Sequence, residues 1–255
     1  MFSNITGEWP KHHRFILASC DETYFNDYFP RFYKTFKEHW AMPIHVHVID
    51  PSDESLLKLE SLDVTYTYCN TNIFDWQMAV DTFKDGKVFT QEDSTIRQWL
   101  YECYCQCQRF VVLGSNMQEQ SVIVADVDAY ALRKPSDDDL KMLFKATAFS
   151  THNTRLMATF CHFSPLHKNI VEKVAKLITD TLSTKFVLGM DQIALKQMFR
   201  KTTNVTLLND TNWIRHWDVK NSLDLKKHNS CLIYHEKGTR GKQKGLQTQW
   251  TDIGL

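Results

Sequence analysis

The chain has 255 residues, which is enough for one large domain or two small ones, and its apolar content of 43 % supports a substantial core. Its 30 basic and 30 acidic residues give a formal net charge of zero, which argues against a nucleic-acid-binding domain, because such domains are usually basic. No apolar run approaches the roughly 18 residues of a membrane-spanning helix, so we expect no transmembrane segment.

The cysteines and the first residues suggest a cellular compartment. The seven cysteines are an odd number, and residues 1–10 have neither the basic start nor the apolar segment of a secretory signal. We therefore expect a soluble protein of a reducing, cytoplasmic compartment.

The first third of the chain alternates between strand and helix patterns. Short apolar or alternating runs predict strands at 14–19, 43–49 and 63–68. Between the first two strands, aromatic residues recur at helical spacing and predict a helix with a buried aromatic face: Phe25, Tyr28, Phe29, Phe32, Tyr33 and Phe36. The strand–helix–strand order predicts a parallel sheet with right-handed crossovers. His45 and His47 share one face of the second strand, where a buried or edge pair is favoured over a metal site.

Residues 70–93 have no clear hydrophobic periodicity and are interpreted as a lid, a substrate-binding loop or a surface loop without function. A long helical pattern follows at 95–113 and contains Cys103, Cys105 and Cys107. A helix places Cys103 and Cys107 on one face and Cys105 elsewhere, so buried apolar cysteines are favoured over a zinc site.

Residues 121–135 carry the strongest functional signal. A run of small and β-branched residues predicts a buried strand that ends at Asp126, with Asp128 one residue further on. Ligands of open α/β sheets bind at this edge, and two carboxylates there can hold a hard divalent cation. A second Asp-x-Asp, at Asp137 and Asp139, follows a proline and is typical of a solvated loop or a helix N-terminus instead.

The second half continues with a short helix near 140–144, strands at 146–150 and 155–163, and a helix that starts at Ser164-Pro165. A further helix starts at Gly189, with Asp191 as its expected cap, and strands are predicted at 205–208 and 231–234. No linker or repeat divides the chain, so we expect one domain over residues 1–255.

Residues 122–135 resemble the metal-binding segment of GT-A glycosyltransferases, most closely family 8, the glycogenin and galactosyltransferase type. The resemblance covers about residues 14–245 and rests on four motifs in the same order: Asp126-Val-Asp128, Phe163-Ser-Pro165, Gly189-Met-Asp-Gln192 and His235-Glu-Lys-Gly238, with Lys242 nearby. It implies an α/β fold: a single GT-A, Rossmann-like domain with a mainly parallel sheet flanked by helices. Its nucleotide-binding half would be residues 14–128, and residues 129–255 would bind the donor sugar and the acceptor.

The resemblance also implies an activity and its residues. The chain would be a hexosyltransferase that uses a nucleotide sugar, with a UDP-sugar expected, and a carbohydrate or glycoconjugate acceptor. Mn²⁺ (or Mg²⁺) would be held by Asp126, Asp128 and His235. The donor sugar would meet Asp191 and Gln192, and the base and ribose would meet Ala18, Cys20, Asp21 and Tyr24. The remaining implied donor contacts are Arg109, Gly238, Arg240 and Lys242.

Two departures from the family pattern keep alternatives open. Met157-Ala-Thr159 stands where the family has Asn-x-Gly, and the Lys-Pro-Trp end is absent. Retention of configuration is expected, with an inverting enzyme that uses Asp191 as base, or a non-catalytic nucleotide- or sugar-binding protein, as alternatives. A sugar-nucleotidyltransferase is disfavoured because residues 20–24 contain no glycine, and a cysteine–histidine zinc protein is the remaining alternative.

Overall fold

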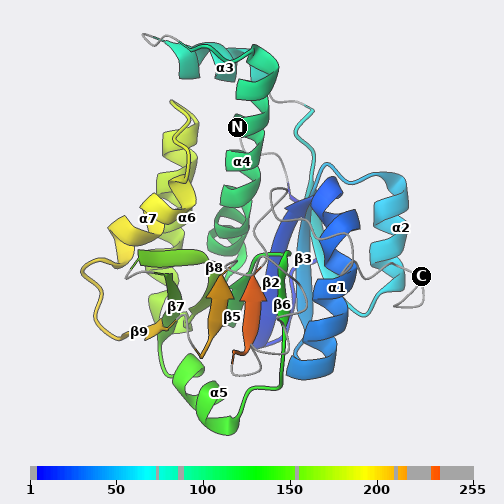
Figure 1. Ribbon diagram of the computed structural model, residues 1–255, viewed down its shortest axis with the longest axis vertical. Helices are drawn as coiled ribbons and strands as arrows, with labels where there is room; N and C mark the ends of the chain where they lie inside the picture. The colour runs from blue at the N-terminus through cyan, green and yellow to red at the C-terminus, as the bar shows by residue number, and fades with distance from the viewer. Residues whose placement is uncertain are drawn as a thin grey trace.

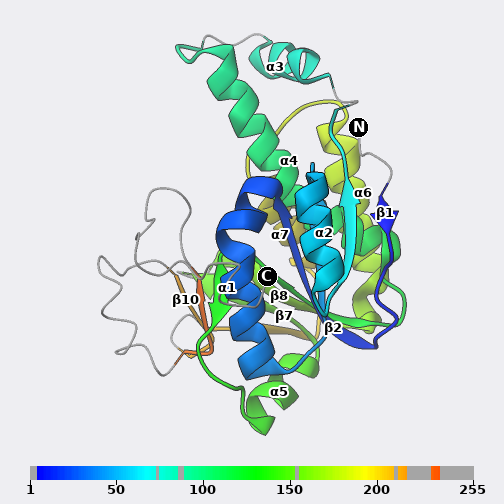
Figure 2. The same cartoon turned by 90° about the vertical axis from the view of Figure 1, so that its right-hand side faces the viewer.

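The computed structural model describes residues 5–72, 75–85, 89–152, 155–209, 212–216 and 231–235. Over these ranges the chain forms a large mixed sheet between two layers of helices, with a small second sheet against one layer (Figures 1 and 2). No helix in the described ranges is long and apolar enough to cross a membrane.

The large sheet has eight strands in the order β1-β4-β3-β2-β5-β8-β7-β9. Its centre is parallel, because β4, β3, β2 and β5 run in one direction, whereas β1 and β8 pair antiparallel at either side. β7 lies antiparallel to β8, and β9 pairs parallel with β7. The strand bounds are β1 Thr6–Gly7, β2 Arg14–Asp21, β3 Ile44–Ile49, β4 Thr65–Cys69, β5 Ser121–Ala125, β7 Thr147–His152, β8 Arg155–Phe163 and β9 Val205–Leu208.

The helices cover both faces of this sheet. They are α1 Glu22–Trp40, α2 Asp53–Ser61, α3 Trp76–Lys84, α4 Asp93–Asn116, α5 Asp137–Phe144, α6 Lys168–Leu182 and α7 Met190–Phe199, with a 3₁₀ turn η1 at Pro165–His167. Alternate residues of β2 belong to opposite cores: Phe15 and Leu17 pack with α4, α6 and α7, and Ile16 and Ala18 pack with α1. This alternation follows from the two-residue period of a strand.

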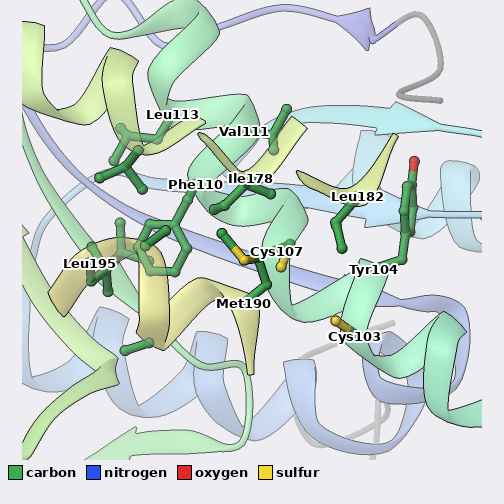
Figure 3. Packing of buried hydrophobic residues seen from close by; sticks show 14 of the residues in the cluster. Cys103, Tyr104, Cys107, Phe110, Val111, Leu113, Ile178, Leu182, Met190 and Leu195 are labelled. Atoms are coloured by element: carbon green, nitrogen blue, oxygen red, sulfur yellow. The ribbon is translucent and has the colours of Figure 1, made fainter. Parts of the chain in front are cut away.

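The expected aromatic face of α1 is confirmed, since Phe25, Phe29, Phe32 and Phe36 have no exposed surface. On the other face, Cys103 and Cys107 of α4 pack with Ile178 of α6 and Met190 of α7 (Figure 3). The two cysteines are buried in an apolar layer, which agrees with the expectation of cysteines as small core residues.

The small second sheet places the end of the described chain against its middle. It consists of β6 (Ala129–Ala131), β10 (Ile214–His216) and β11 (Ile233–His235), with β11 between the other two. β11 runs antiparallel to β6, and His235 lies opposite Ala129. The register therefore brings His235 next to the segment that leaves β5.

Two local expectations differ from the structure. Residues 76–84 form helix α3, whose start is capped by the Asp75 carboxylate accepting from the Met78 amide. This helix is held by Trp76, which packs edge-on against Tyr101 and Tyr104, so its stability comes from contacts distant in sequence. Asp191 does not cap α7: Gly189 is the cap residue, with φ +70°, and Asp191 lies in the first turn.

Candidate metal and donor site

Carboxylates follow three neighbouring strands where the chain leaves the sheet. Asp21 is the last residue of β2, Asp50 follows β3 and Asp126 follows β5. The carboxyl ends of these parallel strands meet at one edge, where the chain passes from the buried sheet to the loops. The sequence-predicted pair, Asp126 and Asp128, therefore lies at the edge where ligands of such sheets bind.

A tight turn orients this pair. The Ala129 amide donates to the Asp126 carbonyl (2.9 Å), and the Asp126 amide donates to the Thr159 carbonyl (2.9 Å). Val127, between the two aspartates, is only 4 % exposed and belongs to the core cluster on the α1 side. Because Val127 is anchored in the core, the turn holds both carboxylates on the side away from it.

His235 completes a cluster with both aspartates. Its Nε2 lies 3.2 Å from Asp126 Oδ2 and 3.2 Å from Asp128 Oδ1. One ligand atom from each of these residues lies within 4.8 Å of the other two, and this is the only group of three potential metal ligands in the described ranges. Two carboxylates and an imidazole form a donor set that suits Mn²⁺ or Mg²⁺, so the residues fit the expected cation.

A buried arginine joins this cluster to the start of α7. Arg109 of α4 forms an ion pair through Nη1 with Asp126 Oδ1, and its Nη2 donates to Asp191 Oδ2 (3.0 Å). The side chains of Arg109 and Asp191 are 7 % and 4 % exposed. The predicted sites on α4, β5 and α7 are thus in direct contact, although 82 residues separate Arg109 from Asp191. Gln192 follows Asp191 on α7 and is partly exposed.

The end of β2 lies within the electrostatic reach of the metal cluster. Asp21 caps α1 by accepting from the Tyr24 amide (2.8 Å), and burial raises the pKa of its carboxyl. Burial, with the charges of Asp128 and Asp21, raises the pKa of Tyr24 to about 12 and also raises the pKa of the Cys20 thiol. Ala18 of the same strand has no exposed surface and packs in the core on the α1 side.

Asp50 was not among the site residues predicted from the sequence, but the structure gives it defined partners at this edge. Asp50 has φ +52°, and its carboxylate accepts from the Thr71 amide (2.5 Å), the Thr71 hydroxyl (2.6 Å) and the Tyr101 hydroxyl (3.2 Å). It thereby connects the ends of β3 and β4 to α4. The only signal in the sequence was a carboxylate directly after a predicted strand.

The remaining sequence predictions concern the histidines of β3, the cysteines and the residues after His235. His45 and His47 are buried and contact threonines of β4, and no group of three metal ligands in the described ranges contains either histidine or a cysteine. Three of the implied donor contacts, Gly238, Arg240 and Lys242, fall outside the described residues.

Comparison with known proteins points to one fold. No family model and no curated protein sequence matches the chain. Among solved structures, the galactosyltransferase LgtC in complex with donor and acceptor sugar analogs matches with a TM-score of 0.53 and 11 % identity, over 94 % of this chain and 92 % of that chain. The bifunctional glycosyltransferase WbbM in its apo form matches with a TM-score of 0.49 and 12 % identity, over 92 % of this chain and 47 % of that chain. The chain therefore has the α/β fold of a GT-A glycosyltransferase.

Proposed function

We propose that the protein is a metal-dependent glycosyltransferase that moves a sugar from a nucleotide sugar, a UDP-sugar, to a carbohydrate or glycoconjugate acceptor. The observation that carries the proposal is the cluster of Asp126, Asp128 and His235 at the carboxyl edge of the parallel strands. Such a cluster can hold a divalent cation that binds a sugar diphosphate, and it occurs in a fold shared with a galactosyltransferase.

The charge of the site supports a divalent cation. Asp126, Asp128 and Asp191 contribute three negative charges, and Arg109 contributes one positive charge, so the formal sum is −2 with a neutral His235. A bound Mn²⁺ or Mg²⁺ would balance this charge and would supply Lewis-acid stabilisation of the leaving diphosphate. His235 and the two aspartates would hold the cation, and the described residues fit that task.

The state of Asp191 supports a retaining outcome over an inverting one. An inverting enzyme needs a base that is free to accept the proton of the acceptor hydroxyl. One oxygen of Asp191 is already bonded to the buried guanidinium of Arg109, and the side chain is 4 % exposed. Asp191 is therefore better suited to orienting donor hydroxyls, and Gln192 beside it would take the place near the anomeric carbon that the family resemblance implies.

The test is calorimetric binding of UDP with and without Mn²⁺, followed by an assay of donor-sugar hydrolysis and transfer. Wild-type protein should bind UDP more tightly with Mn²⁺, and Asp126→Asn/Asp128→Asn should lose that dependence. Removal of the metal carboxylates should raise the reaction barrier by several kcal/mol, on the order of a thousandfold in rate or more.

The chain offers a matched control in the exposed start of α5. Asp137→Asn/Asp138→Asn removes the same charge from exposed positions and leaves the Ser136–Asp139 capping box intact. This control should behave as wild type. If folded wild-type protein binds neither UDP nor GDP, CDP or ADP with Mn²⁺ present, the proposal is wrong. Metal-dependent binding without turnover of any donor would favour the non-catalytic alternative, which the Met157-Ala-Thr159 departure beside Asp126 keeps open.

A further inference from the structure

Arg109 lies between two carboxylates that belong to different parts of the proposed site. On one side its Nη1 is paired with Oδ1 of Asp126, which is also a member of the metal cluster. On the other side its Nη2 is bonded to Oδ2 of Asp191, at the start of α7. All three side chains are largely withdrawn from water, since Asp126, the most exposed, is 19 % exposed.

The two oxygens of Asp126 have different partners. Oδ1 is held by Arg109, whereas Oδ2 lies 3.2 Å from His235 Nε2. Arg109 thus holds one oxygen of Asp126 and helps to position this carboxylate beside His235.

The same guanidinium also opposes the cation. A positive charge in contact with a metal ligand repels a divalent cation at that ligand, and the repulsion is strong because water screens buried charges poorly. The negative charge of Asp191 lies on the far side of Arg109 and offsets part of this repulsion. The affinity for the cation therefore depends on the balance between Arg109 and Asp191 as well as on the three ligands.

We propose that Arg109 is a positioning residue that lowers the affinity of the cluster for its cation and couples that affinity to Asp191. This inference rests on the proposed function, because it assumes that Asp126, Asp128 and His235 hold a divalent cation. Linkage makes the coupling reciprocal: whatever changes the pairing of Asp191 with Arg109 changes cation affinity, and cation binding changes how firmly Arg109 holds Asp191. A donor hydroxyl that engages Asp191 would thus be sensed at the metal ligands.

The proposal predicts an order of Mn²⁺ affinities for four proteins. Arg109→Gln removes the opposing charge and should bind Mn²⁺ about tenfold more tightly than wild type. Asp191→Asn leaves Arg109 to pair with Asp126 alone and should bind about tenfold more weakly. Arg109→Gln/Asp191→Asn restores the wild-type formal charge and should lie near wild type.

This order separates the proposal from a purely structural role. An arginine that only supported the fold would weaken cation binding when removed, since the ligands would lose their alignment. The proposal predicts the opposite sign for Arg109→Gln, together with a slower reaction, because Asp126 and Asp191 are no longer oriented. Arg109→Lys keeps the charge and should retain near-wild-type Mn²⁺ affinity.

The experiment is titration with Mn²⁺ alone, without nucleotide, followed by electron paramagnetic resonance of the free ion. Circular dichroism and metal-free thermal unfolding of each variant confirm that it is folded. The matched control is Arg97→Gln, an exposed arginine on the same helix, which should bind as wild type. If Arg109→Gln does not fold, Asp191→Asn and Arg109→Lys still test the proposal, since the first should bind Mn²⁺ more weakly and the second about as wild type.

The outcomes distinguish this inference from the proposed function. Mn²⁺ binding by wild type that is lost in Asp126→Asn/Asp128→Asn, with the predicted order, supports both. The same binding with weaker affinity in Arg109→Gln, or with no change in Asp191→Asn, overturns the role of Arg109 alone. Absence of Mn²⁺ binding by folded wild type overturns the metal site itself, and the inference with it.

Discussion

Gly114 shows how a single residue sets the distance between two helices. It lies on α4 where α4 packs against α6, and a Cβ atom at this position would stand 2.4 Å from Ala175 Cβ and 3.0 Å from the Val171 carbonyl oxygen. Both atoms belong to helix α6, and neither is the far end of a flexible side chain that could move away. The close approach places α4, with Arg109 on it, firmly in the core.

We predict that Gly114→Ala destabilises the protein. Alanine gains up to about 1 kcal/mol of helix propensity over glycine, but overpacking of a tight core typically costs about 1–3 kcal/mol, so the net effect is a loss. Urea unfolding measures the change in free energy. Gly114→Ala/Ala175→Gly removes the contact with Ala175 Cβ but keeps that with the Val171 carbonyl oxygen, so it should recover part of the loss. A single variant as stable as wild type would contradict the close crossing.

At the scale of elements, a ladder of polar side chains joins β3 to β4. His45 contacts the hydroxyls of Thr65 and Thr67 (3.0 Å each), and His47 contacts Thr67 (3.0 Å) and the sulfur of Cys69 (3.4 Å). Burial lowers the pKa of both histidines to about 3. Burial therefore favours the neutral imidazoles, and the ladder helps to fix the register of the two strands.

This ladder predicts a dependence of stability on pH. Above the ordinary pKa of about 6.5, the histidines are neutral in both the folded and the unfolded chain and contribute no pH dependence. As the pH falls from there towards about 3, the unfolded chain binds protons that the folded chain does not, so the free energy of unfolding decreases. Each histidine contributes up to about 1.4 kcal/mol per pH unit.

Urea unfolding of wild type at about pH 7 and about pH 5 should show this decrease, and His47→Gln should show a smaller one. Carboxyl groups also titrate in this range, but they do so in both proteins. The difference between wild type and His47→Gln therefore isolates the contribution of His47 to the decrease in the free energy of unfolding. Equal decreases in wild type and His47→Gln would contradict the buried, neutral state of His47.

At the scale of the whole molecule, the proposed site is assembled from distant segments. Asp126 and Asp128 follow β5, Arg109 lies on α4, Asp191 starts α7 and His235 ends β11. A cation at this cluster would link β5 and β6 of the middle of the chain to β11 near its end. Binding there should therefore stabilise the folded molecule as a unit.

We predict that Mn²⁺ raises the thermal unfolding temperature and that a chelator reverses the rise. When the concentration of free Mn²⁺ is about 100-fold above its dissociation constant, binding to the folded state raises the free energy of unfolding by about 2.7 kcal/mol. Differential scanning fluorimetry measures the shift in unfolding temperature for wild type, Asp126→Asn/Asp128→Asn and His235→Asn. The aspartate variant should show no shift and His235→Asn a reduced one. An equal shift in all three proteins would mean that Mn²⁺ binds elsewhere.

Local sequence patterns predicted much of the element order. The aromatic period of α1, the apolar runs of β2, β3 and β5, and the proline start of the segment that leads into α6 all arise from near neighbours in sequence. Helix α3 was missed because Asp75 and Trp76 identify it only through a cap and a packing contact with α4. The fold class followed from the strand–helix alternation together with the family resemblance, and it agrees with the observed sheet.

The sequence by itself determined that Asp126 and Asp128 stand at the end of a buried strand, because an apolar run of fixed length ends there. The sequence also showed that the motifs containing Asp191 and His235 follow in the same order as in the family that the chain resembles. Only the tertiary structure decided that Arg109 bridges Asp126 and Asp191, and that His235 faces both metal carboxylates. The physical reason is that periodicity specifies which face of an element is buried. Which charges meet across elements depends on strand register, on helix crossings such as that of α4 with α6 at Gly114, and on the pairing of β11 with β6.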